Sequence, residues 1–258
     1  MRLRAERGFA DPRALKDTGD RESHEFLISQ LTAYRPGEPV LSEEGHDAST
    51  RLCADRVWIV DPLDGTREFG EEGRTDWAVH VALWERDRLA AGAVALPAQD
   101  KTLATGDDDG AIVQERNAAQ ARPLRARGPA GRQDGRPPRV AVSRTRPPEF
   151  LRRLADHMDL TFVPIGSAGA KISAVLLGEV DAYIHAGGQY EWDSAAPAAV
   201  ALAAGVHASR IDGSALEYNQ KDPTLPDILV CQPELAPTLL AGIRTVTETS
   251  QTDAGSKS

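Results

Sequence analysis

Two carboxylates at the end of an apolar run are the first feature of the sequence that could support chemistry. The hexapeptide Asp-Pro-Leu-Asp-Gly-Thr occupies residues 61–66, directly after the apolar run 57–60. Asp61 and Asp64 repel each other at this spacing unless a cation lies between them. Oxygen ligands without histidine or cysteine favour Mg²⁺ or Mn²⁺ over zinc. The structural alternative is a polar turn after a core strand, and the hexapeptide alone does not separate the two.

Further acids stand in similar places elsewhere in the chain. Asp20 is at the expected start of a helix, Glu43 and Glu44 follow a short apolar run, and Asp193 opens an alanine-rich segment. Each acid has a structural alternative as a helix cap or turn residue. Because all of them fall at the ends of elements, where binding residues are usually presented, we expect them to meet in one site. Such a site would support attack of a metal-activated water on a phosphate monoester.

Other phosphate-related patterns narrow the mechanism. Gly166 and Ser167 precede an expected helix, so their backbone N–H groups could face a phosphate, although this glycine signal is weak. A phosphatase with an aspartyl nucleophile would carry Asp-x-Asp-Gly-Thr, in which the acids stand closer together than they do here. No Cys-x5-Arg loop surrounds Cys53 or Cys231, and a Walker phosphate loop is absent. Hydrolysis by an activated water is therefore favoured over a covalent route.

Three motifs in a fixed order carry a resemblance to a known family. Glu43-Glu44, the hexapeptide 61–66 and Trp-Asp-Ser-Ala-Ala-Pro at 192–197 resemble the inositol monophosphatase superfamily of lithium-sensitive phosphatases, over roughly residues 13–235. The resemblance implies an α/β fold, an α/β/α/β layered sandwich. It also implies that two or three Mg²⁺ ions, with Mn²⁺ as a possible substitute, are bound by Glu43, Asp61, Asp64, Asp193 and the main-chain carbonyl of Leu63. Asp20 with Thr66 would orient and deprotonate the attacking water.

Shorter motifs favour one branch of this superfamily. Arg-Glu-Phe at 67–69, with the segments 41–44, 166–171 and 216–218, resembles the CysQ-type 3′(2′),5′-bisphosphate nucleotidases of actinobacteria. The resemblance implies a Mg-dependent phosphomonoesterase that removes the 3′-phosphate of 3′-phosphoadenosine 5′-phosphate in sulfur assimilation, giving AMP and phosphate. The expected substrate contacts are Gly65, Thr66, Gly166, Ser167 and Lys171. For Lys171, a solvated helix lysine is an equally good alternative.

Two other functions stay open at this stage. Another phosphatase of the superfamily would act on inositol 1-phosphate or fructose 1,6-bisphosphate. A catalytically silent regulator would keep the fold and bind metal or nucleotide without turnover. The intact pair of Asp20 and Thr66 weighs against the silent regulator, because such a protein need not keep water-activating groups.

Composition excludes several classes of protein. With 258 residues, 41% hydrophobic and 27% charged, the chain can bury a sizeable core. Its formal net charge of −9 argues against sequence-independent nucleic-acid binding. The two cysteines are too few for a disulfide framework, and no run is apolar for long enough to cross a membrane. We therefore expect a cytoplasmic enzyme, with a homodimer possible.

The order of the expected elements divides the chain into two lobes. Residues 1–121 are expected to form a metal-binding lobe with an antiparallel meander. Residues 140–246 are expected to form an α/β lobe, because strand and helix patterns alternate there. The segment 122–139, rich in proline, glycine and arginine, is expected to be a flexible linker, and 247–258 a disordered tail.

Three local expectations bear on the first lobe. A helix is expected over 21–34, which would place Asp20 at its N-terminus. The strand before the hexapeptide is expected to stop at Asp61, because Pro62 lacks an N–H group. The helix expected over 1–7 is short where the superfamily has a long one, so an upstream extension is expected to raise the melting temperature.

Overall fold

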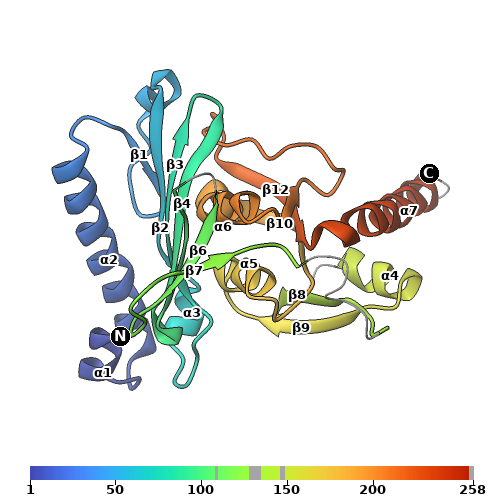
Figure 1. Ribbon diagram of the computed structural model, residues 1–258, viewed down its shortest axis with the longest axis horizontal. Coiled ribbons are helices and arrows are strands. Elements are labelled where there is room, and N and C mark those ends of the chain that lie inside the picture. The colour runs from blue at the N-terminus through green and yellow to red at the C-terminus, as the bar shows by residue number, and fades with distance from the viewer. Residues whose placement is uncertain (108–109, 128–134, 146–148, 256–258) are drawn as a thin grey trace.

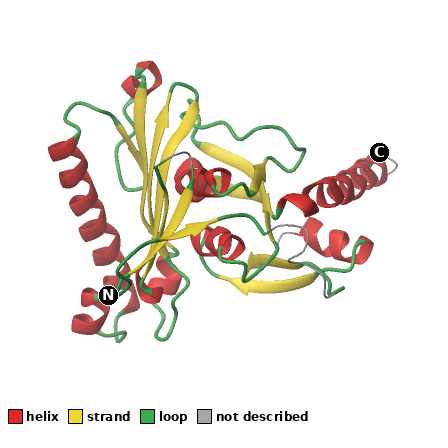
Figure 2. Ribbon diagram, in the orientation of Figure 1, coloured by secondary structure: helices red, strands yellow, loops and turns green. Residues whose placement is uncertain are grey.

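Helices and sheets alternate in five layers (Figures 1 and 2). A computed structural model describes residues 1–107, 110–127, 135–145 and 149–255. Helix α2 (Pro12–Tyr34) lies along the outer face of the first sheet, with α1 (Arg2–Arg7) and α3 (Thr66–Phe69) near its N-terminal end. Between the two sheets lie α5 (Ala168–Leu176) and α6 (Glu191–Ala203), and the far side of the second sheet is covered by α4 (Glu149–His157) and α7 (Ala236–Gly255). The expected mixed α/β sandwich is confirmed, and α4 with α7 adds a fifth layer to the four expected.

The first sheet is a meander in which spatial order follows sequence order. Its strands are β1 (Val40–Ser42), β2 (Arg56–Asp64), β3 (Ala78–Glu85), β4 (Arg88–Leu96), β5 (Lys101–Thr105), β6 (Ala111–Glu115) and β7 (Arg122–Leu124). β1 and β2 are parallel, and every other neighbouring pair in this sheet is antiparallel. The expected hairpin of 77–84 with 89–96 is therefore confirmed as β3 with β4.

The second sheet has crossovers and mixed direction, as an α/β lobe requires. Its spatial order is β11 (His207–Ser209), β12 (Thr224–Cys231), β10 (Ala182–Tyr190), β8 (Arg139–Ser143) and β9 (Thr161–Ile165). β10, β8 and β9 are parallel, whereas β12 is antiparallel to both of its neighbours. Single 3-10 turns are η1 (Ser49–Cys53), η2 (Pro97–Gln99) and η4 (Pro233–Leu235).

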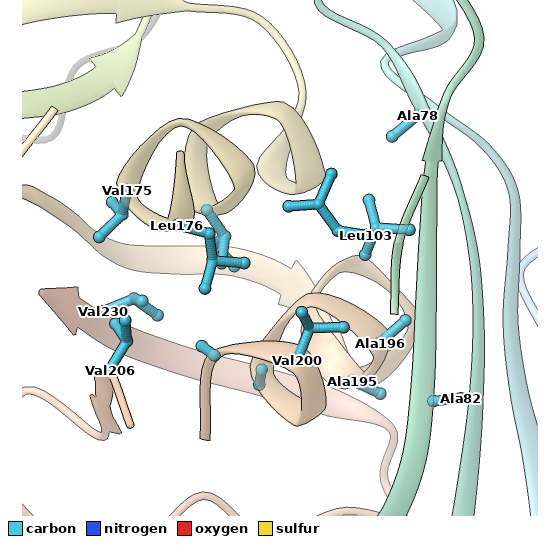
Figure 3. Close-up of a cluster of buried hydrophobic side chains, with 14 of the residues drawn as sticks. Ala78, Ala82, Leu103, Val175, Leu176, Ala195, Ala196, Val200, Val206 and Val230 are labelled. Atoms are coloured by element: carbon cyan, nitrogen blue, oxygen red, sulfur yellow. The ribbon is translucent and has the colours of Figure 1, made fainter. Parts of the chain in front are cut away.

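Small side chains bring α6 close to the first sheet. Figure 3 shows Ala196 of α6 in the buried cluster between Ala82 of β3 and Val230 of β12. On β4, a Cβ atom at Gly92 would lie 2.5 Å from the carbonyl oxygen of Ala196, so only glycine allows this approach. The close packing of α6 on β3 and β4 sets the position of Asp193, which stands in the first turn of that helix.

Helix α2 begins earlier than expected, and this changes the place of Asp20. Asp11 caps the helix by accepting a hydrogen bond from a backbone N–H at 3.0 Å, and Pro12 occupies the first turn. The polar stretch before Asp20 is therefore helical, and the expectation that Asp20 stands at a helix N-terminus is wrong. Gly19 fits inside the helix because a Cβ atom there would lie 2.6 Å from Phe69 Cε1.

Two segments differ from the expected division of the chain. β7 pairs with β6, so the first sheet extends into 122–139, the segment expected to be a linker; residues 128–134 lie outside the described residues. α7 includes residues 247–255 of the expected disordered tail, and residues 256–258 lie outside the described residues. Ile243 and Val246 of this helix keep the helical spacing and pack into the core. Within the described ranges, no helix is long and apolar enough to cross a membrane.

Candidate active site

A bulge near the end of β2 brings the two aspartates of the hexapeptide together. β2 continues through Pro62 to Asp64 instead of stopping at Asp61, and its pairing with β3 shifts register between the two acids. Pro62 falls in this irregular stretch, where its missing N–H group interrupts no ladder of hydrogen bonds. Gly65 then adopts a φ of 84°, which residues with side chains avoid, and turns the chain into α3.

The N-terminus of α5 and a histidine hold the carboxylate of Asp64. Ala168 N donates to Oδ1 at 3.2 Å, Gly169 N donates to Oδ2 at 2.5 Å, and His80 Nε2 lies 3.2 Å from Oδ2. Burial alone would raise the pKa of Asp64, but His80 and the Gly169 N–H group outweigh it and hold this pKa below its ordinary value. Asp64 is therefore a fixed negative charge at the positive end of a helix.

Asp20 and Thr66 meet although 46 residues separate them in the sequence. Thr66 Oγ1 donates to the Leu63 carbonyl at 3.1 Å and lies 3.5 Å from Asp20 Oδ1. Burial, followed by repulsion from Glu44, raises the pKa of Asp20 to about 6. The structure thus brings the two residues together, with Asp20 inside α2 and Thr66 in the first turn of α3.

The other predicted acids form a cluster of mutually repelling groups. Glu43 follows β1, Asp61 lies on β2, and Asp193 occupies the first turn of α6. Burial, followed by repulsion from Asp20, raises the pKa of Glu43 to about 7. Burial, followed by repulsion from Asp64, raises the pKa of Asp193 to about 7 and that of Asp61 well above its ordinary value. Buried carboxylates that repel one another are stabilised when a divalent cation lies among them.

The donor set fits a divalent cation. Ligand atoms of Asp61, Asp64 and His80 lie within 4.8 Å of one another, so this group could bind a metal. Glu43 and Asp193 interact electrostatically with Asp64 and extend the group. Most of the donors are carboxylate oxygens, which hard divalent cations prefer. The predicted acids from β2, from α6 and from the residue after β1 therefore interact with one another, and their binding of a metal stays a prediction.

The loop before α5 does not leave its N–H groups open as expected. Gly166 N donates to Asp76 Oδ2 at 2.6 Å, and Ser167 N donates to the Asp76 carbonyl at 3.1 Å. Ser167 Oγ accepts from Ala170 N at 3.0 Å and caps the helix. Asp64 accepts hydrogen bonds from the next two N–H groups, those of Ala168 and Gly169. The N–H groups in the first turn of α5 are therefore hydrogen-bonded within the protein. The expectation that Gly166 and Ser167 bind phosphate through these N–H groups is wrong.

Lys171 is buried, so the alternative of a solvated helix lysine is wrong. Its side chain is on the second turn of α5, and the residue is 5% exposed. Nζ donates to the Gly166 carbonyl and lies 5.3 Å from the centre of the Tyr183 ring. Burial lowers the pKa of Lys171, against the attraction of Asp64 and other acids. A contact of Lys171 with substrate stays a prediction, as do contacts of Gly65 and Thr66.

His80 is the residue of this site that the sequence did not single out. β3 alternates buried and half-buried positions, and His80 falls on the buried side with 0% exposure. A histidine in the apolar phase of an alternating strand was the available signal. Glu68 of the Arg-Glu-Phe motif is likewise buried and forms an ion pair with Arg144 at 3.0 Å. This glutamate therefore links α3 to the end of β8.

Known proteins match this chain over most of its length. Residues 9–248 match the profile of the inositol monophosphatase family. A 3′-phosphoadenosine 5′-phosphate phosphatase of Mycobacterium leprae is 51% identical over 258 aligned residues, which cover 95% of this chain and 88% of the relative. A 3′(2′),5′-bisphosphate nucleotidase CysQ of Salmonella typhimurium is 32% identical and covers 80% of each chain.

A solved structure agrees with the fold. Inositol monophosphatase-II of Staphylococcus aureus superposes with a TM-score of 0.75, at 22% identity, over 93% of this chain and 90% of the other. At this level of identity the likeness concerns the fold alone. Because residues 9–248 match the family profile and the relatives are 51% and 32% identical, the chain belongs to the inositol monophosphatase family.

Proposed function

We propose that this protein is a Mg²⁺-dependent phosphatase that removes the 3′-phosphate of 3′-phosphoadenosine 5′-phosphate, giving AMP and phosphate. The observation that carries the chemistry is the group of buried carboxylates beside the pair of Asp20 and Thr66. The choice of substrate is supported by the 51% identity to a relative with that name. Inositol 1-phosphate or fructose 1,6-bisphosphate hydrolysis and a silent regulator are the alternatives that the experiment separates.

In this proposal the acids from three elements hold the metal. The residues that would hold two or three Mg²⁺ ions, or Mn²⁺ in their place, are Glu43, Asp61, Asp64, Asp193 and Leu63 through its carbonyl. When bound, the ions neutralise the phosphate, acidify the attacking water and stabilise the leaving oxygen. The protein's own contribution is to hold the carboxylates at fixed positions against their mutual repulsion, through the packing of β1, β2 and α6.

Asp20 accepts the proton of the attacking water through the Thr66 hydroxyl. Thr66 Oγ1 donates its one hydrogen to the Leu63 carbonyl at 3.1 Å and lies 3.5 Å from Asp20 Oδ1, so in the reaction it would turn this hydrogen from Leu63 to Asp20 while it accepts one from a water molecule. A pKa of about 6 keeps Asp20 mostly ionised at neutral pH and close to the pKa that suits a general base there. Asp20 is therefore proposed as the base and Thr66 as the group that relays and orients.

Lys171 supplies positive charge for the anionic substrate in the same proposal. It is buried next to the carboxylate site, since Asp64 and Asp193 are among the groups that attract it. Gly65 and Thr66 would approach the phosphate with their backbone at the turn into α3. We also propose a homodimer, because the outer helix α2 leaves Phe26 60% and Tyr34 77% exposed. A cytoplasmic location stays a prediction.

The substrate is tested by comparing three phosphate esters with Mg²⁺ under the same conditions. Phosphate release from 3′-phosphoadenosine 5′-phosphate is expected to have a kcat/KM at least about tenfold above that from inositol 1-phosphate or fructose 1,6-bisphosphate. A higher value for either of the other esters would replace the proposed substrate. Binding of the nucleotide without release of phosphate from any of them would establish the silent regulator.

The role of the base is tested with two matched variants on α2. Asp20→Asn is expected to lower kcat by about 10²–10⁴ while Mg²⁺ binding, measured by calorimetry, is retained. Glu22→Gln is the control, because Glu22 is an exposed carboxylate on the same helix. Activity of Asp20→Asn equal to that of the control would contradict the assignment of the base.

A further inference from the structure

His80 makes contacts on both sides of its ring that the proposed reaction does not use. It lies on β3, between the end of β2, which carries Asp64, and the start of α6, which carries Asp193. The side chain is fully buried, so each ring nitrogen faces a group of the protein rather than solvent. Each nitrogen faces one of these two elements.

The chemistry of the partners determines what each nitrogen does. Nδ1 lies 3.1 Å from the Trp192 carbonyl oxygen, and since a carbonyl has no hydrogen to give, Nδ1 is the donor. Nε2 lies 3.2 Å from Asp64 Oδ2, which is an ion-pair distance, and makes no hydrogen bond in the described part of the chain. One ring therefore connects the carboxylate of Asp64 to the residue directly before Asp193.

Three nitrogen groups surround the Asp64 carboxylate. Gly169 N and His80 Nε2 both approach Oδ2, and Ala168 N approaches Oδ1. A carboxylate offers about four lone-pair positions, two on each oxygen. The two N–H groups take one position on each oxygen, and the imidazole lies against Oδ2 at 3.2 Å. Without the imidazole, only the two N–H groups of α5 would hold the carboxylate, and Oδ2 would be held by Gly169 N alone.

The first turn of α5 fixes the imidazole from the other side. A Cβ atom at Gly169 would lie 2.0 Å from His80 Nε2 and 3.0 Å from Asp64 Oδ2. Only glycine at this position lets the helix approach both groups. The ring is therefore confined by α5, by the Trp192 carbonyl and by Asp64, and it has no space to adopt another orientation.

We infer that His80 is a positioning residue: its imidazole fixes Asp64 through Oδ2, relative to the start of α6, so that Oδ1 is directed to the metal. The inference rests on the proposed function only in taking Asp64 as a metal ligand. A group that orients a ligand in this way commonly contributes about 10–100-fold to metal affinity. The competing interpretation is that Nε2 itself binds the metal, with the Nδ1–H group on the Trp192 carbonyl.

Two amide variants distinguish the role of Nε2 from the role of Nδ1. In His80→Gln the amide nitrogen can replace Nε2 and donate to Asp64, whereas in His80→Asn it can replace Nδ1 and donate only to the Trp192 carbonyl. Mg²⁺ binding to the metal-free protein is measured by calorimetry without substrate. We expect His80→Asn to weaken Mg²⁺ binding by about 10–100-fold and His80→Gln to restore it to within about threefold of the wild type.

A histidine far from the site serves as the control. His207 lies on β11 and contacts Ser209 at 2.9 Å, so His207→Gln should leave Mg²⁺ binding unchanged. Equal weakening in His80→Gln and His80→Asn, or no weakening in either, would overturn the inference. A loss of Zn²⁺ affinity in His80→Gln that exceeds the loss of Mg²⁺ affinity would overturn it in favour of direct ligation, because imidazole is a preferred zinc ligand.

A second variant tests the inference if the His80 variants do not fold. Gly169→Ala keeps the imidazole but places a methyl group against Nε2, and alanine is favoured over glycine inside a helix. It should weaken Mg²⁺ binding by at least about tenfold, and wild-type binding would overturn the inference. Because these measurements use Mg²⁺ alone, a protein that binds Mg²⁺ but hydrolyses none of the three esters would refute the proposed function without affecting this result.

Discussion

Replacing Arg51 should strongly destabilise the fold, although this residue is not part of the candidate active site. Its side chain is 1% exposed and donates to Asp47 at 2.7 and 3.0 Å, to Asn219 Oδ1 at 2.7 Å and to the Gln220 carbonyl at 2.8 Å. Asn219 N and Gln220 N in turn donate to Glu191, at 2.6 and 2.7 Å. Arg51 thus connects η1 to the first residue of α6.

The expected loss of stability in an Arg51 variant depends on which of its partners can be rehydrated. Removing one member of a buried charged network costs about 3–5 kcal/mol. Asp47 is 40% exposed and can be rehydrated, which places the expected cost of Arg51→Met near the lower limit, about 3 kcal/mol. For a chain of this size, about 3 kcal/mol corresponds to a decrease of roughly 6–12 °C in the melting temperature.

Arg56→Met is the matched control for this prediction. Arg56 also forms a hydrogen-bonded ion pair, with Glu85 at 2.6 Å, but its side chain is 45% exposed. Its loss should cost much less than the loss of Arg51, because solvent screens an exposed ion pair. Both variants are compared with the wild type by urea unfolding, followed by tryptophan fluorescence and circular dichroism. Equal free energies of unfolding for the two variants would refute the argument from burial.

Three further predictions concern the site itself. Because the pKa values of Glu43 and Asp193 are raised to about 7 in the folded state, the metal-free protein should become more stable as the pH falls from 8 to 6. Mg²⁺ should therefore raise the melting temperature more at pH 8 than at pH 6. An equal rise in melting temperature at both pH values would contradict this prediction. Gly65 has a φ of 84°, and a Cβ atom there would lie 2.7 Å from Ser167 Cβ. Gly65→Ala should therefore lower the free energy of unfolding in urea by about 1–3 kcal/mol. An unchanged unfolding midpoint would refute the argument from backbone strain. Lys171→Met should raise KM for 3′-phosphoadenosine 5′-phosphate by at least about tenfold, and an unchanged KM would exclude a substrate contact.

Much of the first lobe could be predicted from the sequence, because the patterns that indicate its elements involve neighbouring residues. The hairpin of β3 and β4 follows from alternating apolar residues around a short charged turn, and the structure confirms it. The turn at Gly65 follows from the tolerance of glycine for positive φ. The start of helix α2 was predicted wrongly, since the polar residues before Asp20 resemble a turn, and the cap at Asp11 lies about two and a half helical turns earlier.

The second lobe shows where local signals were insufficient. Ser167 and the helix after it were expected, but the partners of the N–H groups in its first turn were not. Asp64 reaches them from 104 residues away in the sequence, and Asp76 reaches Gly166 from 90 residues away. No local pattern contains these pairings, because they depend on how the two sheets pack against α5.

The sequence by itself determined the chemical types and order of the donors. The acids of the hexapeptide, with Glu43 and Asp193, predicted an oxygen-rich metal site, and side-chain chemistry does not depend on the fold. Only the tertiary structure decided which charge each acid carries and which partner it has. His80 and the first turn of α5 hold the pKa of Asp64 below its ordinary value, whereas burial raises the pKa of Asp61, although the two belong to one hexapeptide. The physical reason is that burial and hydrogen-bond partners are properties of packing between distant segments, and a pKa responds to those surroundings.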